Sequence, residues 1–289
     1  MKPFNGHIFK EMKIIKHSGA IVDFNAEKLK NSLLKSGASQ LVVEGILEAI
    51  KKEIYEGIST KQIYKMAFRL LKKVGDSHAS RYNLKAAIQL LGPAGFFFEK
   101  YIARLFASEK YEIKTNLNLQ GKCISHEIDV VILKNNHMAM VECKFHVGRD
   151  AVSDVKVPMY VLSRFNDLKE KEHFIFDKKG SLSKCWIVTN NRFTSDAIDF
   201  SKCMDLSLLS WNYPENNNLK TKNDEACLYP VTCLTTLSIA EKEKLLILDL
   251  ILAKELVNNA HPLEKIGLSV NRIKNVMKEA SELCRCFES

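Results

Sequence analysis

The first ninety residues combine one hairpin pattern with four helical patterns. Residues 13–22 (KIIKHSGAIV) place two apolar runs around a polar segment that contains a glycine, which predicts a β-hairpin. Apolar residues then recur at helical spacing up to Gly92-Pro93, a pair that stops helices. This periodicity predicts four helices, over about residues 25–34, 43–54, 60–74 and 77–91.

Beyond Pro93 the pattern changes from helical to alternating. Residues 96–113 (FFFEKYIARLFASEKYEI) predict one amphipathic helix. Alternation and short apolar runs then predict strands over 123–133, 138–145, 184–189 and 206–211, with helices over 152–167 and 193–203. A helix that leads into an antiparallel β-pair, followed by further helices and strands, predicts an α/β core with helices flanking a mixed sheet.

The last seventy residues divide into a polar stretch and a helical unit. Residues 214–227 are poor in apolar side chains and predict a loop or linker. Residues 228–289 form the helical C-terminal unit, and its segment 263–282 fits a helix-hairpin-helix pattern, with Gly267 at the turn and Lys274 and Lys278 on the next helix. A helical cap or a dimer contact explains this unit equally well. The chain is thus expected to be a multi-domain α/β protein, with a tail over 1–12 and domains over 13–92, 93–213 and 228–289.

The composition narrows the class of protein. The 289 residues are 46% hydrophobic and 27% charged, as in a folded globular protein, and no apolar stretch is long enough to span a membrane. The eight cysteines lack C-x-x-C spacing, so we expect reduced thiols and a cytoplasmic location. The net charge of +9 is compatible with a polyanionic partner but does not prove one.

Three charged residues stand within the two most apolar strands. Asp129 lies in IDVVI, and Glu142 and Lys144 lie in MVECK after a polar turn. Alternate side chains of a strand share a face, so Glu142 and Lys144 point the same way and Cys143 points into the core. If the strands pair as a hairpin, Asp129 lies near Glu142. Two carboxylates so placed suit Mg²⁺, whereas three unrelated charges on an exposed face would be the plain alternative.

The segments HEIDVVI and VECKF resemble the PD-(D/E)XK nuclease superfamily, most closely restriction endonucleases of the Mrr kind, over about residues 93–213. The resemblance implies that Asp129 and Glu142 bind the metal together with the backbone carbonyl of Cys143. It also implies that Lys144 positions or activates the attacking water, and that Glu99 is the acidic residue of the preceding helix. The implied reaction is metal-assisted hydrolysis of phosphodiester bonds.

Four neighbours of this constellation carry weaker expectations. Glu127 shares the face of Asp129 by alternation and is either a further ligand or a simple strand-end charge. His126 is expected to face the other way in a structural role. Lys156 and Arg164, on the following helix, are either DNA-phosphate contacts or part of a solvated helix face.

Residues 13–92 resemble the ATP-cone, a regulatory nucleotide-binding domain, through IIKHSGAIVDFNAEKL, EGISTKQIYKMAFRLL and SRYNLKAAI. The resemblance implies ATP or dATP as regulatory ligand, with phosphate contacts from Lys16 and Lys28. The other implied binding residues are Ile15, His17, Asn25 and Thr60. His17 replaces the arginine usual in the family, and Val22 replaces a polar side chain. No G-x-x-x-x-G-K-[ST] loop is present, which indicates sensing rather than ATP-driven motion.

Together these patterns predict a nucleotide-regulated, Mg²⁺-dependent DNA endonuclease of a restriction or defence system, with double-stranded DNA as partner. One alternative is a nucleotide-responsive DNA-binding regulator without catalysis. Another is a DNA-repair or RNA nuclease of the same fold. A cone that only mediates dimerisation is a further alternative, and a homo-oligomer is compatible with each of these.

Overall fold

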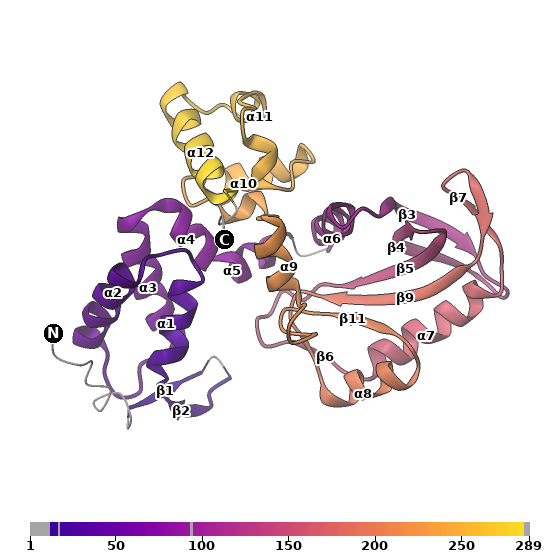
Figure 1. Ribbon diagram of the computed structural model, residues 1–289, viewed down its shortest axis with the longest axis horizontal. Helices are drawn as coiled ribbons and strands as arrows, with labels where there is room; N and C mark the ends of the chain where they lie inside the picture. The colour runs from indigo at the N-terminus through magenta and orange to yellow at the C-terminus, as the bar shows by residue number, and fades with distance from the viewer. Residues whose placement is uncertain (1–11, 17, 93–94, 286–289) are drawn as a thin grey trace.

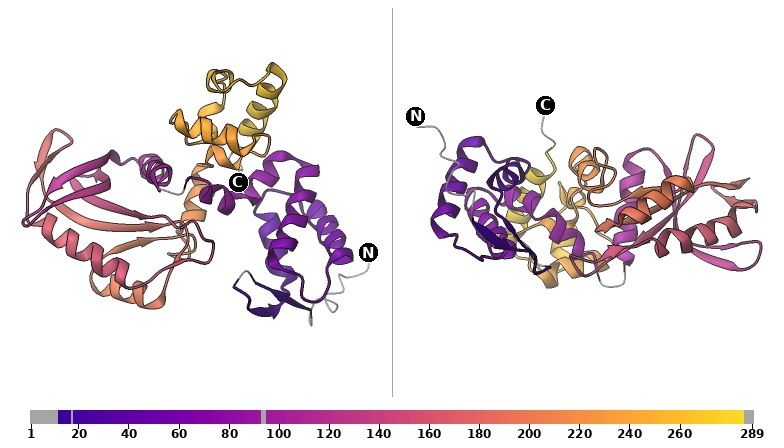
Figure 2. Two further views of the ribbon diagram at one scale, coloured as in Figure 1. Left: turned by 180° about the vertical axis from the view of Figure 1, so that it is seen from behind. Right: turned by 90° about the horizontal axis from the view of Figure 1, so that it is seen from below.

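The structure is a computed structural model, and it describes residues 12–16, 18–92 and 95–285. The chain forms a mostly helical N-terminal unit, a central α/β unit built on a mixed sheet, and a helical C-terminal unit (Figure 1). Seen from below, the N-terminal and central units lie at opposite ends with C-terminal helices between them (Figure 2). The predicted multi-domain α/β class is confirmed. No helix within the described ranges is long and apolar enough to cross a membrane.

The N-terminal unit begins with the predicted hairpin and continues with helices. The hairpin consists of β1 (Lys13–Ile15) and β2 (Ile21–Asp23), which pair antiparallel. The Asn25 side chain accepts a hydrogen bond from the Lys28 amide and so caps the first helix. The predicted helix over 77–91 is wrong as one element, because it breaks at Asn83, whose side chain accepts a hydrogen bond from the Tyr64 hydroxyl at 2.5 Å. The helices are α1 (Ala26–Leu34), α2 (Gln40–Glu53), α3 (Thr60–Val74), α4 (Asp76–Tyr82) and α5 (Leu84–Gln89).

The central unit is built on a five-stranded sheet of order β11-β9-β5-β4-β3. The first three strands along the chain pair antiparallel, and the other two run parallel to β5. Helix α6 (Phe96–Ser108) covers one face, and α7 (Lys156–Lys169) and α8 (Ser195–Cys203) cover the other (Figure 1). The strands are β3 (Glu112–Gln120), β4 (Ser125–Lys134), β5 (His137–Lys144), β9 (Leu182–Thr189) and β11 (Ser207–Leu209).

Some strands of this unit were not expected. The predicted helix over 96–113 ends at Ser108, and Lys110 takes a left-handed conformation (φ 67°) that turns the chain into β3. The alternation of Ile113, Leu117 and Leu119 with polar residues is the period-2 signal of that strand. Two short pairs also form, β7 with β8 and β6 with β10. Their strands are β6 (Val152–Ser153), β7 (His173–Ile175), β8 (Lys178–Gly180) and β10 (Arg192–Phe193).

The predicted loop or linker over 214–227 is wrong in part, because most of this stretch forms the helix α9 (Leu219–Ala226). This polar helix is capped by Asn218, and it buries Leu219 and Asn223. The Tyr101 hydroxyl of α6 donates to Asn223 Oδ1 at 2.9 Å, which satisfies the buried amide. The next residue, Cys227, is disulfide-bonded, so the expectation of reduced thiols fails there.

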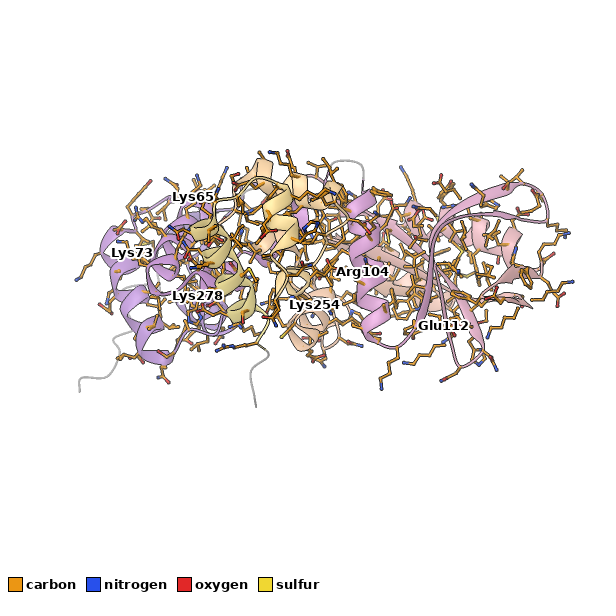
Figure 3. The ribbon with its side chains drawn as sticks, turned by 90° about the horizontal axis from the view of Figure 1, so that it is seen from above. Lys65, Lys73, Arg104, Glu112, Lys254 and Lys278 are labelled. Atoms are coloured by element: carbon orange, nitrogen blue, oxygen red, sulfur yellow. The ribbon has the colours of Figure 1, made fainter. Side chains whose placement is uncertain are left out.

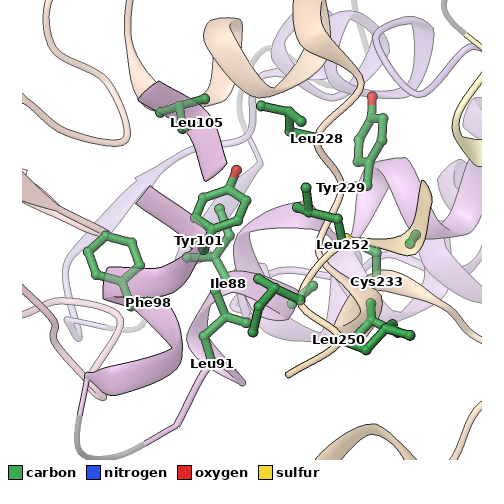
Figure 4. Packing of buried hydrophobic residues seen from close by; sticks show 14 of the residues in the cluster. Ile88, Leu91, Phe98, Tyr101, Leu105, Leu228, Tyr229, Cys233, Leu250 and Leu252 are labelled. Carbon is green, nitrogen blue, oxygen red and sulfur yellow. The ribbon is translucent and has the colours of Figure 1, made fainter. Parts of the chain in front are cut away.

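One hydrophobic core joins the three units. It contains residues of α5, α6, the sheet and the C-terminal helices (Figure 4). The N-terminal helices α1 to α4 have a separate core, and so has the sheet face under α7 and α8. The residues that Figure 4 labels in the shared core are Ile88, Leu91, Phe98, Tyr101, Leu105, Leu228, Tyr229, Cys233, Leu250 and Leu252.

Hydrogen bonds connect the C-terminal unit to the N-terminal helices. Arg81 of α4 donates to the backbone carbonyls of Glu282 and Leu283 at the end of the last helix. Gly267 (φ 86°) lies between the last two helices, as predicted, and Lys278 points outward from the second of them (Figure 3). The elements are the 3-10 turns η2 (Val231–Cys233) and η3 (Ala253–Leu256) and the helices α10 (Ile239–Ile247), α11 (His261–Lys265) and α12 (Val270–Leu283).

Candidate active site

Asp129 lies where the strand pairing of β4 is interrupted. The β4–β5 ladder ends at the pair Val130 and Val141, and the β3–β4 ladder passes over Asp129, which stands opposite Asn116. Asn116 has a left-handed backbone (φ 53°), a conformation that asparagine tolerates better than most residues. The Asp129 side chain turns toward β5, where its Oδ2 accepts a hydrogen bond from the Cys143 amide at 2.7 Å. The irregularity therefore places a carboxylate against the end of β5.

Glu142 and Lys144 lie on one face of β5, as alternation requires. Glu142 is buried (4% exposed), and its Oε1 lies 2.8 Å from the Lys144 ammonium nitrogen. Its Oε2 lies 2.5 Å from Nη1 of Arg164, which comes from α7. Arg164 also donates to the backbone carbonyl of Glu127. Both oxygens of Glu142 are thus held by cations, which offset the cost of burying its charge.

Glu99 approaches the same place from the opposite face of the sheet. It lies in the first turn of α6, whose N-cap Gly95 has φ 83°, a conformation that favours glycine. Burial and then the negative charge of Asp129 raise the pKa of Glu99 to about 7. The carboxyl groups of Glu99 and Asp129 come from different elements, α6 and β4, yet they lie close enough to repel each other.

The pKa of Asp129 is raised to about 6. Burial is the main cause, and the charge of Glu142 adds to it, whereas the hydrogen bond from the Cys143 amide and the cations Lys144 and Arg164 act in the other direction. Carboxyl groups that raise each other's pKa in a partly buried site resist ionisation, which is typical of functional sites.

This donor set fits a hard divalent cation in its chemistry. Asp129, Glu142 and the Cys143 carbonyl offer only oxygen, and a cation would relieve the repulsion that raises the Asp129 pKa. No group of three His, Cys, Asp or Glu side chains in the described part of the chain is already gathered to hold a metal. Each oxygen of Glu142 already accepts from one cation, so a bound metal would share this carboxylate with Lys144 and Arg164.

The neighbours of the site take different roles from one another. His126 is buried and its Nε2 lies 2.8 Å from Asp167 Oδ2, which gives it the structural role expected. Glu127 is exposed, and its charge is among those that raise the Glu99 pKa. Lys156 is exposed, whereas Arg164 is mostly buried and bound to Glu142 rather than presented to a phosphate.

Sequence reasoning missed two contributors to the site. Tyr160, one helical turn before Arg164 on α7, lies under both cations, with its ring centroid 6.0 Å from the Lys144 nitrogen and 5.6 Å from the Arg164 guanidinium carbon. The usable signal was an aromatic and a cation at i, i+4 on the helix after the E-x-K strand. His146 follows Lys144, and its Nε2 lies 2.9 Å from the Ser153 hydroxyl.

The raised pKa of Glu99 predicts that Glu99→Gln changes the free energy of unfolding in a pH-dependent way. Because the folded-state pKa of about 7 exceeds the ordinary 4.5, the folded state holds more protons between these values, so the free energy of unfolding falls as pH rises through that window. Glutamine cannot ionise, so the Glu99→Gln variant does not undergo this fall in the free energy of unfolding. With a discount for its half-exposed side chain, we expect the variant to gain about 1–2 kcal/mol over the parent near pH 8.

Urea unfolding of both proteins near pH 5 and near pH 8 measures this effect. The gain should be several-fold smaller at the lower pH, where Glu99 holds its proton in the folded protein and the unfolded chain has only begun to lose it. An equal gain at both pH values would show that the effect comes from packing and not from the charge.

Apart from the candidate active site, the N-terminal unit contains a cavity of about 430 Å³ between its hairpin and its helices. Four of the expected nucleotide contacts, Lys16, Asn25, Lys28 and Thr60, line it, and we name it the cone pocket. Ile15 is not among its lining residues, because alternation on β1 turns Ile14 inward instead. The remaining expected contact, His17, lies outside the described residues.

Comparison with known families identifies three parts of the chain. Residues 12–88 match the family model of the ATP cone domain, residues 93–211 that of a restriction endonuclease domain, and residues 229–284 that described as AF1548-like, C-terminal. Nucleases with this catalytic pattern commonly use divalent metal ions, and ATP cones bind nucleotides.

Three known proteins are similar to parts of this chain. An uncharacterized protein of Archaeoglobus fulgidus is 31% identical over 183 residues, which are 63% of this chain and 99% of the relative. The crystal structure of AF1548, a protein of unknown function, superposes with a TM-score of 0.54 and 29% identity, over 65% of this chain and 97% of that one. Can2 from Sulfobacillus thermosulfidooxidans, solved in complex with cyclic tetra-adenylate, reaches a TM-score of 0.30 at 17% identity, over 68% of this chain and 53% of that one. The chain therefore belongs to the family of this Archaeoglobus fulgidus protein and carries an ATP cone domain, then a restriction endonuclease domain, ahead of a domain that matches the AF1548-like C-terminal model.

Proposed function

We propose that this protein is a nucleotide-regulated, metal-dependent endonuclease that hydrolyses double-stranded DNA in the cytoplasm as part of a restriction or defence system. The observation that carries the proposal is the buried carboxylate of Glu142, held beside Lys144 and across from Asp129 at the end of β5. Even with its cations in place, a buried ion pair stabilises a fold no better than apolar packing, so a plain structural role explains this cluster poorly.

In this proposal Asp129, Glu142 and the Cys143 carbonyl hold Mg²⁺. When bound, the cation stabilises negative charge on the phosphate and on the leaving oxygen. Lys144 donates to Glu142 here, and its ammonium group can turn to orient the attacking water. Glu99, whose pKa of about 7 lies near neutrality, can accept or return a proton at working pH.

The choice among nuclease classes depends on the substrate. Full-length protein is incubated with duplex DNA, single-stranded DNA and RNA, each with Mg²⁺ and with a chelator in its place. Cleavage of duplex DNA that depends on the metal supports the proposal, and cleavage of RNA alone supports the RNA-nuclease alternative. Mobility shift of duplex DNA without any cleavage supports the non-catalytic regulator.

The regulatory part of the proposal concerns the cone pocket. Lys16 and Lys28 line this cavity, and each is a compact cation suited to a nucleotide phosphate. We expect Lys28→Ala to weaken ATP or dATP binding about tenfold, because it removes one charge-assisted contact. Calorimetry measures this on the full chain, since α5 shares its core with the C-terminal unit and the N-terminal segment alone would expose it.

The matched control for this prediction is Lys30→Ala, on the same helix but absent from the lining of the cone pocket. Unchanged affinity in the control and weaker affinity in Lys28→Ala support the cone pocket as the binding site. Equal affinities in both variants and the parent would mean that nucleotide binds outside the cone pocket. No binding heat with the parent at millimolar nucleotide would leave only the dimerisation role for this unit.

A further inference from the structure

A cavity of about 270 Å³ lies at the junction of the cone, the nuclease domain and α9. We name it the junction cavity. The cone contributes Lys35 and Lys85, the loop after β5 contributes Arg149, and α9 contributes Lys220. Aromatic rings complete the wall, among them Tyr64 and Trp211. Three parts of the chain therefore contribute basic side chains to one partly open space.

The positive charge of the junction cavity is poorly balanced. None of Lys35, Lys85, Arg149 and Lys220 forms a salt bridge within the described part of the chain. Arg149 donates instead to the neutral Gln89 side chain at 3.0 Å, and the Lys85 nitrogen lies 5.6 Å from the Trp211 ring centroid.

The electrostatics of the two half-buried lysines, Lys85 and Lys220, agree with this imbalance. Burial lowers the pKa of Lys85, and the charges of Arg149 and Arg192 lower it further. Burial likewise lowers the pKa of Lys220, with Lys35 adding to the effect. The opposing carboxylates are Asp150 for Lys85 and Asp224 for Lys220, and only Asp224 lines the cavity. A bound anion would relieve this repulsion.

We propose that the junction cavity is a second nucleotide site, distinct from the cone pocket, in which Lys35, Lys85, Arg149 and Lys220 hold the phosphate groups. A DNA duplex is too wide to enter a cavity of this size, so the ligand is a small molecule. The rings of Tyr64 and Tyr82 stack at 5.0 Å between centroids along one wall and offer a surface for a base.

The position of the junction cavity gives its ligand a route to the nuclease site. Arg149 lies on the loop that follows Lys144 at the end of β5, so a phosphate held there bridges the cone helices to that strand end. A consequence for cleavage rests on the proposed nuclease function, whereas binding itself does not.

Calorimetry with ATP and with inorganic tripolyphosphate tests the proposal on the full chain. The variants are Lys85→Gln with Arg149→Gln for the junction cavity and Lys28→Gln for the cone pocket. The control for the double variant is Lys244→Gln with Lys265→Gln, which removes the same charge from exposed positions outside both cavities. The parent should bind a second ATP. The junction variant should lose one ATP and at least about tenfold in tripolyphosphate affinity, while Lys28→Gln loses the other ATP.

Each outcome separates the two sites. One ATP per chain, lost in Lys28→Gln alone, overturns the second site and keeps the cone pocket. One ATP lost in the junction variant alone keeps the second site and removes the cone pocket. One ATP lost in both variants indicates a single extended site, because Ser32, Tyr64 and Tyr82 line both cavities, and it overturns the proposal. If the double variant unfolds without ligand, Arg149→Gln at its exposed position gives the same test.

Discussion

Replacing Asp129 with asparagine, or Lys144 with alanine, is expected to lower the DNA cleavage rate by about a thousandfold, or roughly 4 kcal/mol of transition-state stabilisation. Asparagine keeps the shape of Asp129 and can still accept the hydrogen bond from the Cys143 amide, so the strand ends stay in place. Only the negative charge is lost. Single-turnover cleavage of a duplex oligonucleotide measures the rate, and a mobility shift measures the DNA affinity, which should change little.

Two substitutions on α8 of the same domain serve as controls. Asp199→Asn and Lys202→Ala remove a carboxylate and an ammonium from exposed positions, and both should cleave at the parent rate. If Asp129→Asn and Lys144→Ala cleave as fast as these controls, the active site lies elsewhere. If all four lose activity together, the loss comes from folding.

Replacing Glu279 with alanine is expected to lower the free energy of unfolding by at least about 3 kcal/mol. Glu279 is 2% exposed on α12 and accepts hydrogen bonds from two backbone amides, Thr235 at 2.6 Å and Thr236 at 3.0 Å. The hydroxyls of both threonines and of Ser80 also donate to it. Alanine leaves the two backbone amides and the Ser80 hydroxyl without this acceptor, and it removes the hydrogen bond from Ser80 of α4 to α12.

Urea denaturation followed by circular dichroism measures the loss in Glu279→Ala. Glu243→Ala, at an exposed position on α10, should stay within about 0.5 kcal/mol of the parent. Unfolding of Glu279→Ala at the same urea concentration as the control would mean that the buried carboxylate costs as much as it contributes.

The central strands could be predicted because their signal is local. Asp129, Glu142 and Lys144 stand in apolar runs joined by a short polar turn, and Asn135 and Asn136 in that turn take the left-handed conformation of a tight hairpin. The strand β3 was missed because its apolar residues are few and follow a strong helix without a proline or glycine between them. Helix α9 was missed because tertiary contacts to Tyr101, not periodicity, bury its polar face.

The parts of the site that escaped prediction depend on distant segments. In the sequence, Arg164 looks like any charged residue on the solvent-exposed face of a helix. Only the packing of α7 on the sheet brings it to Glu142. The same holds for the junction cavity, whose basic residues come from segments as far apart as Lys35, Arg149 and Lys220. Sequence periodicity carries no information about such pairings.

The most direct test of the nuclease assignment is the conversion of supercoiled plasmid by the parent protein and by Asp129→Asn, purified in parallel. ATP is added in separate samples at fixed free Mg²⁺, because ATP itself chelates the metal. We predict that the parent nicks or linearises the plasmid with Mg²⁺ and not with a chelator, and that Asp129→Asn leaves it supercoiled. Equal cleavage by both proteins, or intact plasmid with the parent under every nucleotide and metal condition, would contradict the account.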